Sequence, residues 1–150
     1  MNKLLLLLFI PFVTFGQDLD FDDIKQIDSE KQYKRVMFEN EFVKLDNNDN
    51  VLTYAYKYSK SSETAQVFSE FLSIYGLMTF QLFRTYDNSS NPMFTRIFEQ
   101  VKKECTFGQF TDLFDLEYAC YTCPNSNYKG TIGFNRGNAG ADFILIFGFK

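Results

Sequence analysis

Hydrophobic and polar positions recur along this chain with two different periods, which separate predicted helices from predicted strands. Between residues 18 and 45 the apolar positions recur every three or four residues, which predicts a helix whose firm part runs from about 30 to 40. Ser29 stands at the N-cap position of that helix, with Gln32 three residues later as in a capping box. The same spacing predicts a second helix over 93–104.

Alternation of apolar and polar residues predicts strands over 51–58, 77–86, 118–123 and 129–134. A last strand over 142–149 is apolar on both faces, which is typical of a central or fully covered strand. Clusters of Asn, Asp, Gly and Pro between these segments predict turns. The predicted fold class is α+β, a mostly antiparallel sheet with two helices packed on it.

The segment 61–76 fits two interpretations. Its polar residues trace one face of a helix that Gly76 would close, but the stretch 67–71 is rich in strand formers. If 64–72 is a strand, both halves of the chain consist of a helix followed by three strands, the order that an αβββ duplication would leave. A helix over 64–72 would contradict the duplication.

The first sixteen residues have the layout of a secretory signal peptide. Lys3 precedes a run of about ten apolar residues, and small or polar residues follow. The apolar run is too short for a relaxed membrane span. We expect cleavage after Gly16, which leaves residues 17–150 as one α+β domain, periplasmic or secreted, with no membrane span in the mature chain.

Composition argues against several classes of function. The 150 residues carry a net charge of −4, and the only basic cluster is the pair Lys102 and Lys103, so nucleic acid is a poor partner. Histidine is absent, which removes the commonest general base and transition-metal ligand. The 19 Phe and 9 Tyr predict a core built on ring contacts. We expect neither a cofactor nor a metal.

An acidic, Asn-rich turn at 46–50 matches a calcium loop only in part. Asp46, Asn48 and Asn50 stand at alternate ligand positions, as in an EF-hand. Val51 and Lys57, however, stand where that loop needs Gly and Glu. The pattern therefore favours a plain turn that leads into a strand.

Three tyrosines form a candidate binding face on the predicted strand 51–58. Tyr54, Tyr56 and Tyr58 share one side of that strand at period two. Such a row either offers an exposed aromatic surface or packs in the core with its hydroxyls reaching the edge.

The three cysteines suggest one disulfide and one free thiol, or an intermolecular pair, because thiols outside the cytosol tend to pair. Cys105 ends a predicted helix on its core face, and Cys120 and Cys123 point to opposite faces of one strand. We expect the pair Cys105–Cys123 and a free Cys120. A redox Cys-x-x-Cys is the alternative, but such pairs owe their reactivity to a helix N-terminus, whereas this pair ends a strand and precedes Pro124.

Asp112, Asp115 and Glu117 form a small acidic group in a predicted loop. Two carboxylates suitably spaced can hydrolyse a glycosidic bond, so this group is the candidate for catalysis. A deep cleft with two facing acidic residues would favour such an enzyme, whereas an exposed aromatic patch would favour a binding module.

The N-terminal segment, which ends Thr14-Phe15-Gly16-Gln17, resembles export signals of Bacteroidota, especially of flavobacteria. Segments 101–107, 121–124 and 128–134 are similar to small exported proteins of that group without an assigned function. The resemblance implies a location and no catalytic residue. Our expectation is a non-catalytic binding or interaction module whose partner is an envelope or extracellular protein, with a carboxylate-dependent hydrolase of glycan or peptide as the alternative.

Overall fold

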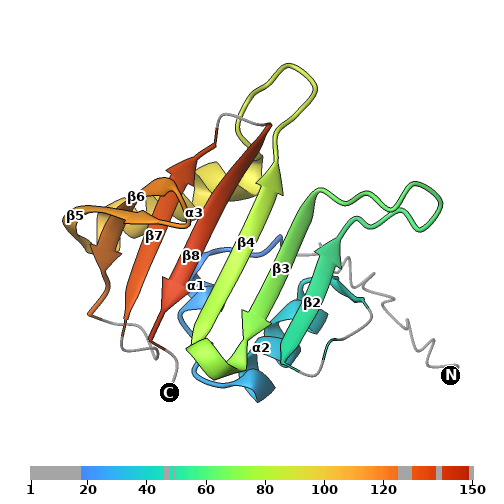
Figure 1. Ribbon diagram of the computed structural model, residues 1–150, viewed down its shortest axis with the longest axis horizontal. Helices are drawn as coiled ribbons and strands as arrows, with labels where there is room; N and C mark the ends of the chain where they lie inside the picture. The colour runs from blue at the N-terminus through green and yellow to red at the C-terminus, as the bar shows by residue number, and fades with distance from the viewer. Residues whose placement is uncertain (1–17, 46–47, 49, 125–129, 138–139, 149–150) are drawn as a thin grey trace, which may run out of the picture.

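The protein forms one eight-stranded antiparallel sheet with its helices packed on one face (Figure 1). The computed structural model describes residues 18–45, 48, 50–124, 130–137 and 140–148. The expected signal peptide lies outside these residues, as does most of the predicted turn at 46–50. In sheet order the strands are β1 (Val43–Lys44), β2 (Val51–Tyr56), β3 (Val67–Leu72), β4 (Leu77–Phe83), β8 (Ala141–Phe147), β7 (Thr131–Arg136), β6 (Leu116–Thr122) and β5 (Thr106–Leu113). The predicted α+β class with a mostly antiparallel sheet is confirmed.

The described residues form three α-helices where two were expected, because the first helical segment is interrupted near Asp28. The helices are α1 (Phe21–Ile24), α2 (Glu30–Glu39) and α3 (Pro92–Glu104). Ser29 caps α2, since its Oγ accepts a hydrogen bond of 3.4 Å from the backbone N–H of Gln32. Asn91 caps α3 in the same way, and α3 ends at Cys105. None of the helices in the described part of the chain is long and apolar enough to cross a membrane.

The main hydrophobic core lies between the helices and one face of the sheet. The largest fully buried side chains there include Tyr33, Phe21, Phe80, Phe94, Met37 and Ile97. The ring of Tyr33 stacks on Phe71 with centroids 5.2 Å apart, and its hydroxyl donates to Ser69 Oγ at 2.9 Å. Each large side chain buried in this way stabilises the fold by about 1.5–3 kcal/mol. This core fixes which face of the sheet the helices cover.

Residues 67–72, which the sequence left between helix and strand, form β3. Val67, Ser69 and Phe71 are buried on the helix side, while Phe68, Glu70 and Leu72 point to the opposite face. Pairing with β2 and β4 along the whole strand outweighs the local helical pattern. A short 3₁₀ turn follows, and Gly76 closes it in the left-handed region at φ 55°.

The two halves of the chain meet in the middle of the sheet. β1 to β4 form one side, β5 to β8 form the other, and β4 pairs with β8 along seven residue positions from Leu77↔Phe147 to Phe83↔Ala141. Each half of the described chain is a helical segment followed by four strands, where the sequence predicted three, since the short β1 and the bulged β5 were not foreseen. A shared order of elements does not demonstrate an αβββ duplication, which stays a proposal. The expected central position of the last strand is confirmed, since β8 lies between β4 and β7.

The segment 106–115 was expected to be a loop and is instead the strand β5 with a tight turn into β6. β5 and β6 pair from Thr106↔Thr122 to Leu113↔Leu116. A bulge between Phe107 and Gln109 breaks the alternation that would have identified the strand. The acidic group thus belongs to a β-hairpin.

Candidate binding groove on the open sheet face

No helix formed by the described residues covers one face of the sheet, and in Figure 1 this face is turned toward the viewer. We call it the open face. Because side chains alternate along a strand, the residues on it are the neighbours in sequence of those in the helix-covered core. On the central strands they are Phe68, Glu70 and Leu72 of β3, Leu77, Thr79 and Gln81 of β4, and Phe143 and Leu145 of β8.

A groove of about 610 Å³ runs over this open face. Strands β3, β4 and β8 supply its floor, and the start of β6 supplies one wall through Leu116 and Tyr118. Phe114, at the turn between β5 and β6, completes that wall. The groove therefore lies between the centre of the sheet and the β5–β6 hairpin, and its lining is mostly apolar.

A small second hydrophobic cluster holds the hairpin against the open face. Leu77, Tyr118, Cys120 and Leu145 are its buried members, with 2–6% of their surface exposed. Gly133 makes the close approach of Tyr118 possible, because a Cβ there would lie 3.2 Å from the Cβ of Tyr118. These contacts fix the position of the hairpin that forms the wall of the groove.

The turn at the tip of the hairpin exposes an aromatic ring. Phe114 (φ 52°) and Asp115 (φ 61°) both lie in the left-handed region that a two-residue type I′ turn requires. Asn and Gly suit these positions, whereas a bulky residue there is strained by about 1–2 kcal/mol. Phe114 nevertheless occupies the first of them with 72% of its surface exposed. The turn thus places a large apolar side chain in solvent at the rim of the groove, at the cost of local backbone strain.

Glu70 is the one charged residue among the described residues that line the groove. It lies at mid-strand in β3, directly opposite Thr53 of β2 on one side and Thr79 of β4 on the other. Within the described part of the chain, no hydrogen bond or ion pair holds its carboxylate. The groove therefore combines an apolar surface with one solvated negative charge flanked by two hydroxyl groups.

The tyrosine row expected as a candidate binding face lies elsewhere. Tyr54 and Tyr56 point to the helix side and keep 6% and 7% of their surface exposed. Their rings contact Tyr33 and Phe42 at centroid distances of 5.5 and 5.3 Å, so both belong to the core. Burial and the nearby Asp18 carboxylate raise the pKa of Tyr56 to about 12. Neither tyrosine forms part of an exposed surface.

Tyr58, the third tyrosine of that row, lies beyond the end of β2. It is half-buried and lines a separate hollow near the β1 edge, together with Val43 and Lys44. The aromatic residues that line the groove are Phe68, Phe114, Tyr118 and Phe143, together with Phe80, whose side chain belongs to the helix-side core. The alternation within 67–72 pointed to Phe68, and the apolar character of both faces of the last strand pointed to Phe143. Phe114 lay in a predicted loop, and no signal in the sequence pointed to it.

The cysteines are joined in the combination expected from the sequence. A disulfide links Cys105, at the end of α3, to Cys123, just after β6. Cys120 points to the opposite face, is buried, and its thiol donates to the carbonyl oxygen of Tyr118 at 3.6 Å. The two sulfur atoms of the Cys-x-x-Cys segment thus lie on different sides of the sheet, which does not suit a redox pair.

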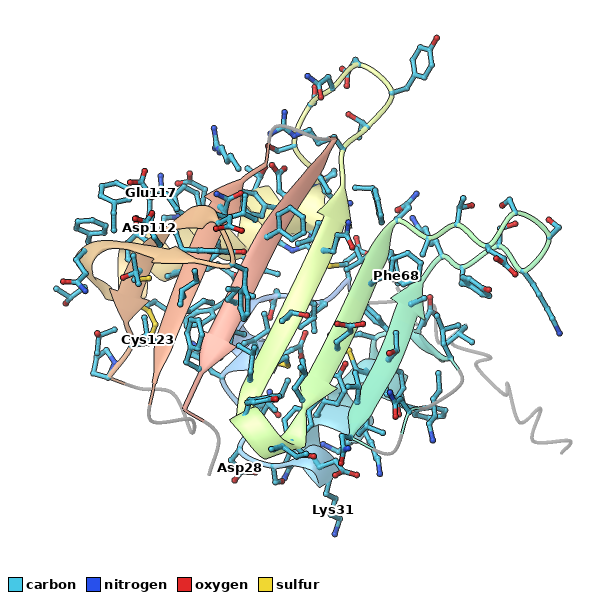
Figure 2. All side chains as sticks on the ribbon, viewed as in Figure 1. Asp28, Lys31, Phe68, Asp112, Glu117 and Cys123 are labelled. Carbon is cyan, nitrogen blue, oxygen red and sulfur yellow. A yellow bond between two sulfur atoms is a disulfide. The ribbon has the colours of Figure 1, made fainter. Side chains whose placement is uncertain are left out.

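The acidic group lies beside the groove, not in it. Asp112 and Glu117 are cross-strand partners on the β5–β6 hairpin (Figure 2), and Asp115 lies in its turn. All three are exposed to solvent. Glu117 lines a smaller hollow of about 310 Å³ that also contains Phe98 and Arg136. Within the described residues, no group of three or more His, Cys, Asp or Glu side chains is arranged to hold a metal ion.

The open face contains a mostly apolar groove with one wall. Glu70 lies in this groove, whereas Asp112, Asp115 and Glu117 lie outside it. No protein-family model matches the chain, and no curated protein or solved structure matches it either.

Proposed function

We propose that this protein is an exported, non-catalytic binding module that holds an envelope or extracellular protein in the groove on its open face. The observation that carries the proposal is the packed, mostly apolar groove with the strained and exposed Phe114 at its rim. Strain of this kind persists where the surrounding structure enforces it, and it gathers at binding sites. An exposed aromatic ring beside an apolar groove is also the usual composition of a binding surface.

Export to the periplasm or the cell exterior is the second part of this proposal. The signal-like first sixteen residues support it, and so does the disulfide, because such bonds persist in oxidising compartments. The resemblance of the N-terminal segment to export signals of Bacteroidota is consistent with this part of the proposal. The domain that acts there comprises residues 17–150.

Binding accounts for the groove better than catalysis does. Hydrolysis by paired carboxylates needs two of them within about 5–10 Å of one bond. The groove lining includes one carboxylate, Glu70, and its remaining polar groups are Thr53, Thr79 and Gln81 together with the phenol of Tyr118. Such groups orient and select a partner without activating a nucleophile.

A site-specific crosslinking experiment tests the proposal. A benzoylphenylalanine side chain replaces Gln81, which lines the groove, or Lys31, which is exposed on α2 at the other face. The full-length chain is expressed in a cell that exports it, and the cells are irradiated. We expect a discrete protein adduct from position 81 and none from position 31. Adducts at neither position, or the same adducts at both, would contradict a partner in the groove.

A carboxylate-dependent hydrolase of extracellular glycan or peptide is the second candidate. It is favoured by one observation, the direct cross-strand pairing of Asp112 with Glu117 next to a hollow. Turnover of cell-wall glycan or peptide by the purified protein, lost in Asp112→Asn and in Glu117→Gln, would support it. Turnover that survives both substitutions would reject this pair as the catalytic groups.

We also propose that the two halves of the chain arose by duplication of an αβββ unit. The support is the topology: β2, β3 and β4 of the first half correspond in order to β6, β7 and β8 of the second, and the last strand of each half meets the other at the sheet centre. The groove floor is then the junction of the two units. Superposition of the two halves with buried positions on buried positions would support this origin, and an out-of-phase match would reject it.

A further inference from the structure

The charge in the groove restricts what can cover it. Glu70 lies at the centre of the floor, with Phe68 and Leu72 two residues away on the same strand and Leu77 on the neighbouring one. A partner that fills the groove must take this carboxylate out of water. Burying an unpaired carboxylate is strongly unfavourable, so the partner must either avoid it or compensate it.

The groove does not supply the compensating charge itself. In the part of the chain that the structure describes, no Lys or Arg lines it. Several basic residues form ion pairs elsewhere in the molecule: Arg84 pairs with Asp142, and the other pairs, on or beside the helices, involve Lys25, Lys34, Arg35, Arg96 and Lys102. Lys44 and Lys60 line the neighbouring hollow that shares Thr53 with the groove, but neither lines the groove itself. We therefore take the cation that pairs with Glu70 in the filled groove to come from the partner.

We infer that the partner is a protein segment that presents a Lys or Arg side chain between apolar side chains. This inference rests on the proposed function, because it names the class of partner for the same groove. The basic group pairs with Glu70, and its apolar neighbours pack on Leu77, Phe143 and Leu145 and against Phe114. An anionic lipid or fatty acid is a poor occupant, since its head group would meet the Glu70 carboxylate.

Arginine suits the site better than lysine. Thr53 and Thr79 stand directly opposite Glu70 in the sheet register, so their hydroxyl oxygens flank the carboxylate. A guanidinium carries five N–H donors in a planar fork, enough for the carboxylate and for both hydroxyls, whereas an ammonium carries three. Selected segments should therefore contain Arg more often than Lys.

A charge-swap selection tests the inference. Random peptides displayed on phage are selected on the protein purified after expression of the full-length chain, as wild type, Glu70→Gln and Glu70→Lys. We expect wild type to enrich Arg or Lys among apolar residues, Glu70→Gln to enrich apolar residues alone, and Glu70→Lys to enrich Asp or Glu. Peptides chosen by wild type should bind Glu70→Gln about tenfold more weakly or worse, the loss of one charged hydrogen bond.

Two further variants control for the position of the charge. Glu39→Gln makes the same chemical change on α2, which lies on the other face of the sheet, and should leave the selection unchanged. Thr79→Arg places a guanidinium beside Glu70 from the next strand and should abolish the preference for basic peptides, because the charge is then already paired. An unchanged basic preference in Thr79→Arg or in Glu70→Gln would overturn the inference.

Crosslinking separates failure of the inference from failure of the proposed function. Selected peptides that crosslink to benzoylphenylalanine at position 81 but contain no excess of Arg or Lys would overturn the basic-partner inference and leave the groove as a binding site. If no peptide is selected, or if the selected peptides crosslink at neither position 81 nor position 31, both proposals fail. Binding of phosphatidylcholine vesicles without any peptide selection would assign the groove to lipid and would also overturn the inference.

Discussion

Cys105 and Cys123 are bonded across the two layers of the fold, with their Cα atoms 4.4 Å apart. Cys105 ends α3, and Cys123 follows β6, the strand that carries the wall of the groove. The bond therefore ties the hairpin half of the sheet to the helix beneath it. Its contribution is to hold the base of the β5–β6 hairpin in place.

Removing this bond should destabilise the protein without changing its fold. Closing a loop across a sequence separation of 18 residues stabilises by about 3 kcal/mol on the chain-entropy estimate, so Cys105→Ala with Cys123→Ala should lower the free energy of unfolding by about that amount. Denaturant titration measures it. As a control, Cys120→Ala keeps the bond and should lose only about 1 kcal/mol. A Cys105–Cys120 link in non-reduced peptide mapping would contradict the pairing.

The sequence pattern identified the elements that obey one period throughout. Alternation in 77–86 and helical spacing in 93–104 each had one interpretation, and β4 and α3 match them to within a few residues. The residues 67–72 were ambiguous because one segment satisfied both periods, and only pairing with two neighbouring strands decides between them. Such pairing is a tertiary effect that local sequence does not contain.

The proposed binding surface was harder to predict than the fold. Tyr54 and Tyr56 were predicted as part of a candidate binding face because they lie on the same side of one strand. A period of two, however, does not show which side of the strand the helices cover. The strand β5 was missed because its bulge disrupts the alternation. The groove depends on both points, since its floor is the uncovered face and its wall is the hairpin that β5 and β6 form.

Arg84 and Asp142 form a salt bridge whose contribution to stability can be tested by mutation. Asp142 has no exposed side-chain surface, its Oδ1 accepts from the Arg84 guanidinium at 3.0 Å, and Arg84 also donates to the carbonyl oxygen of Gly137 at 2.7 Å. Arg84→Ala leaves a buried carboxylate without its cation and should cost about 3–5 kcal/mol in unfolding free energy. Measured by denaturant titration, Arg84→Ala with Asp142→Ala should cost less than the sum of the two single losses. Strictly additive losses would show that the two groups do not interact.

Alkaline pH should destabilise the protein partly through Tyr56. The folded-state pKa of Tyr56 is raised to about 12, above the ordinary value of 10.0, chiefly by burial. Between these two values the unfolded chain loses the proton first, so stability falls as pH rises from about 10 to 12. Urea midpoints measured across this range should fall more steeply for wild type than for Tyr56→Phe, which removes the group that titrates. Parallel curves would refute the assignment to Tyr56.

Processing of the N-terminus provides a direct test of export. We expect the exported protein to begin at Gln17, because the small residue Gly16 precedes the predicted cleavage site. Intact-mass spectrometry of protein recovered outside the cytoplasm of an exporting host checks this. As a control, a variant with Leu6→Arg and Leu7→Arg interrupts the apolar run and should stay uncleaved. Protein recovered outside the cytoplasm that retains Met1 would refute cleavage.

We expect the Phe114 side chain to reduce the free energy of unfolding and to contribute to binding of the partner. Phe114→Asn places a residue that tolerates the left-handed region at φ 52°, so the free energy of unfolding should rise by about 0.5–1 kcal/mol. Little packing opposes that gain, since 72% of the Phe114 surface is exposed. The same substitution removes the rim of the groove and should weaken crosslinking from position 81.

Phe110→Asn is the matched control for this prediction. The Phe110 ring contacts Phe107 at 5.3 Å on β5, outside the turn, so the same chemical change there should reduce stability. If Phe114→Asn is destabilised as much as the control, the turn is not strained; if its crosslinking is unchanged, the ring does not contact the partner.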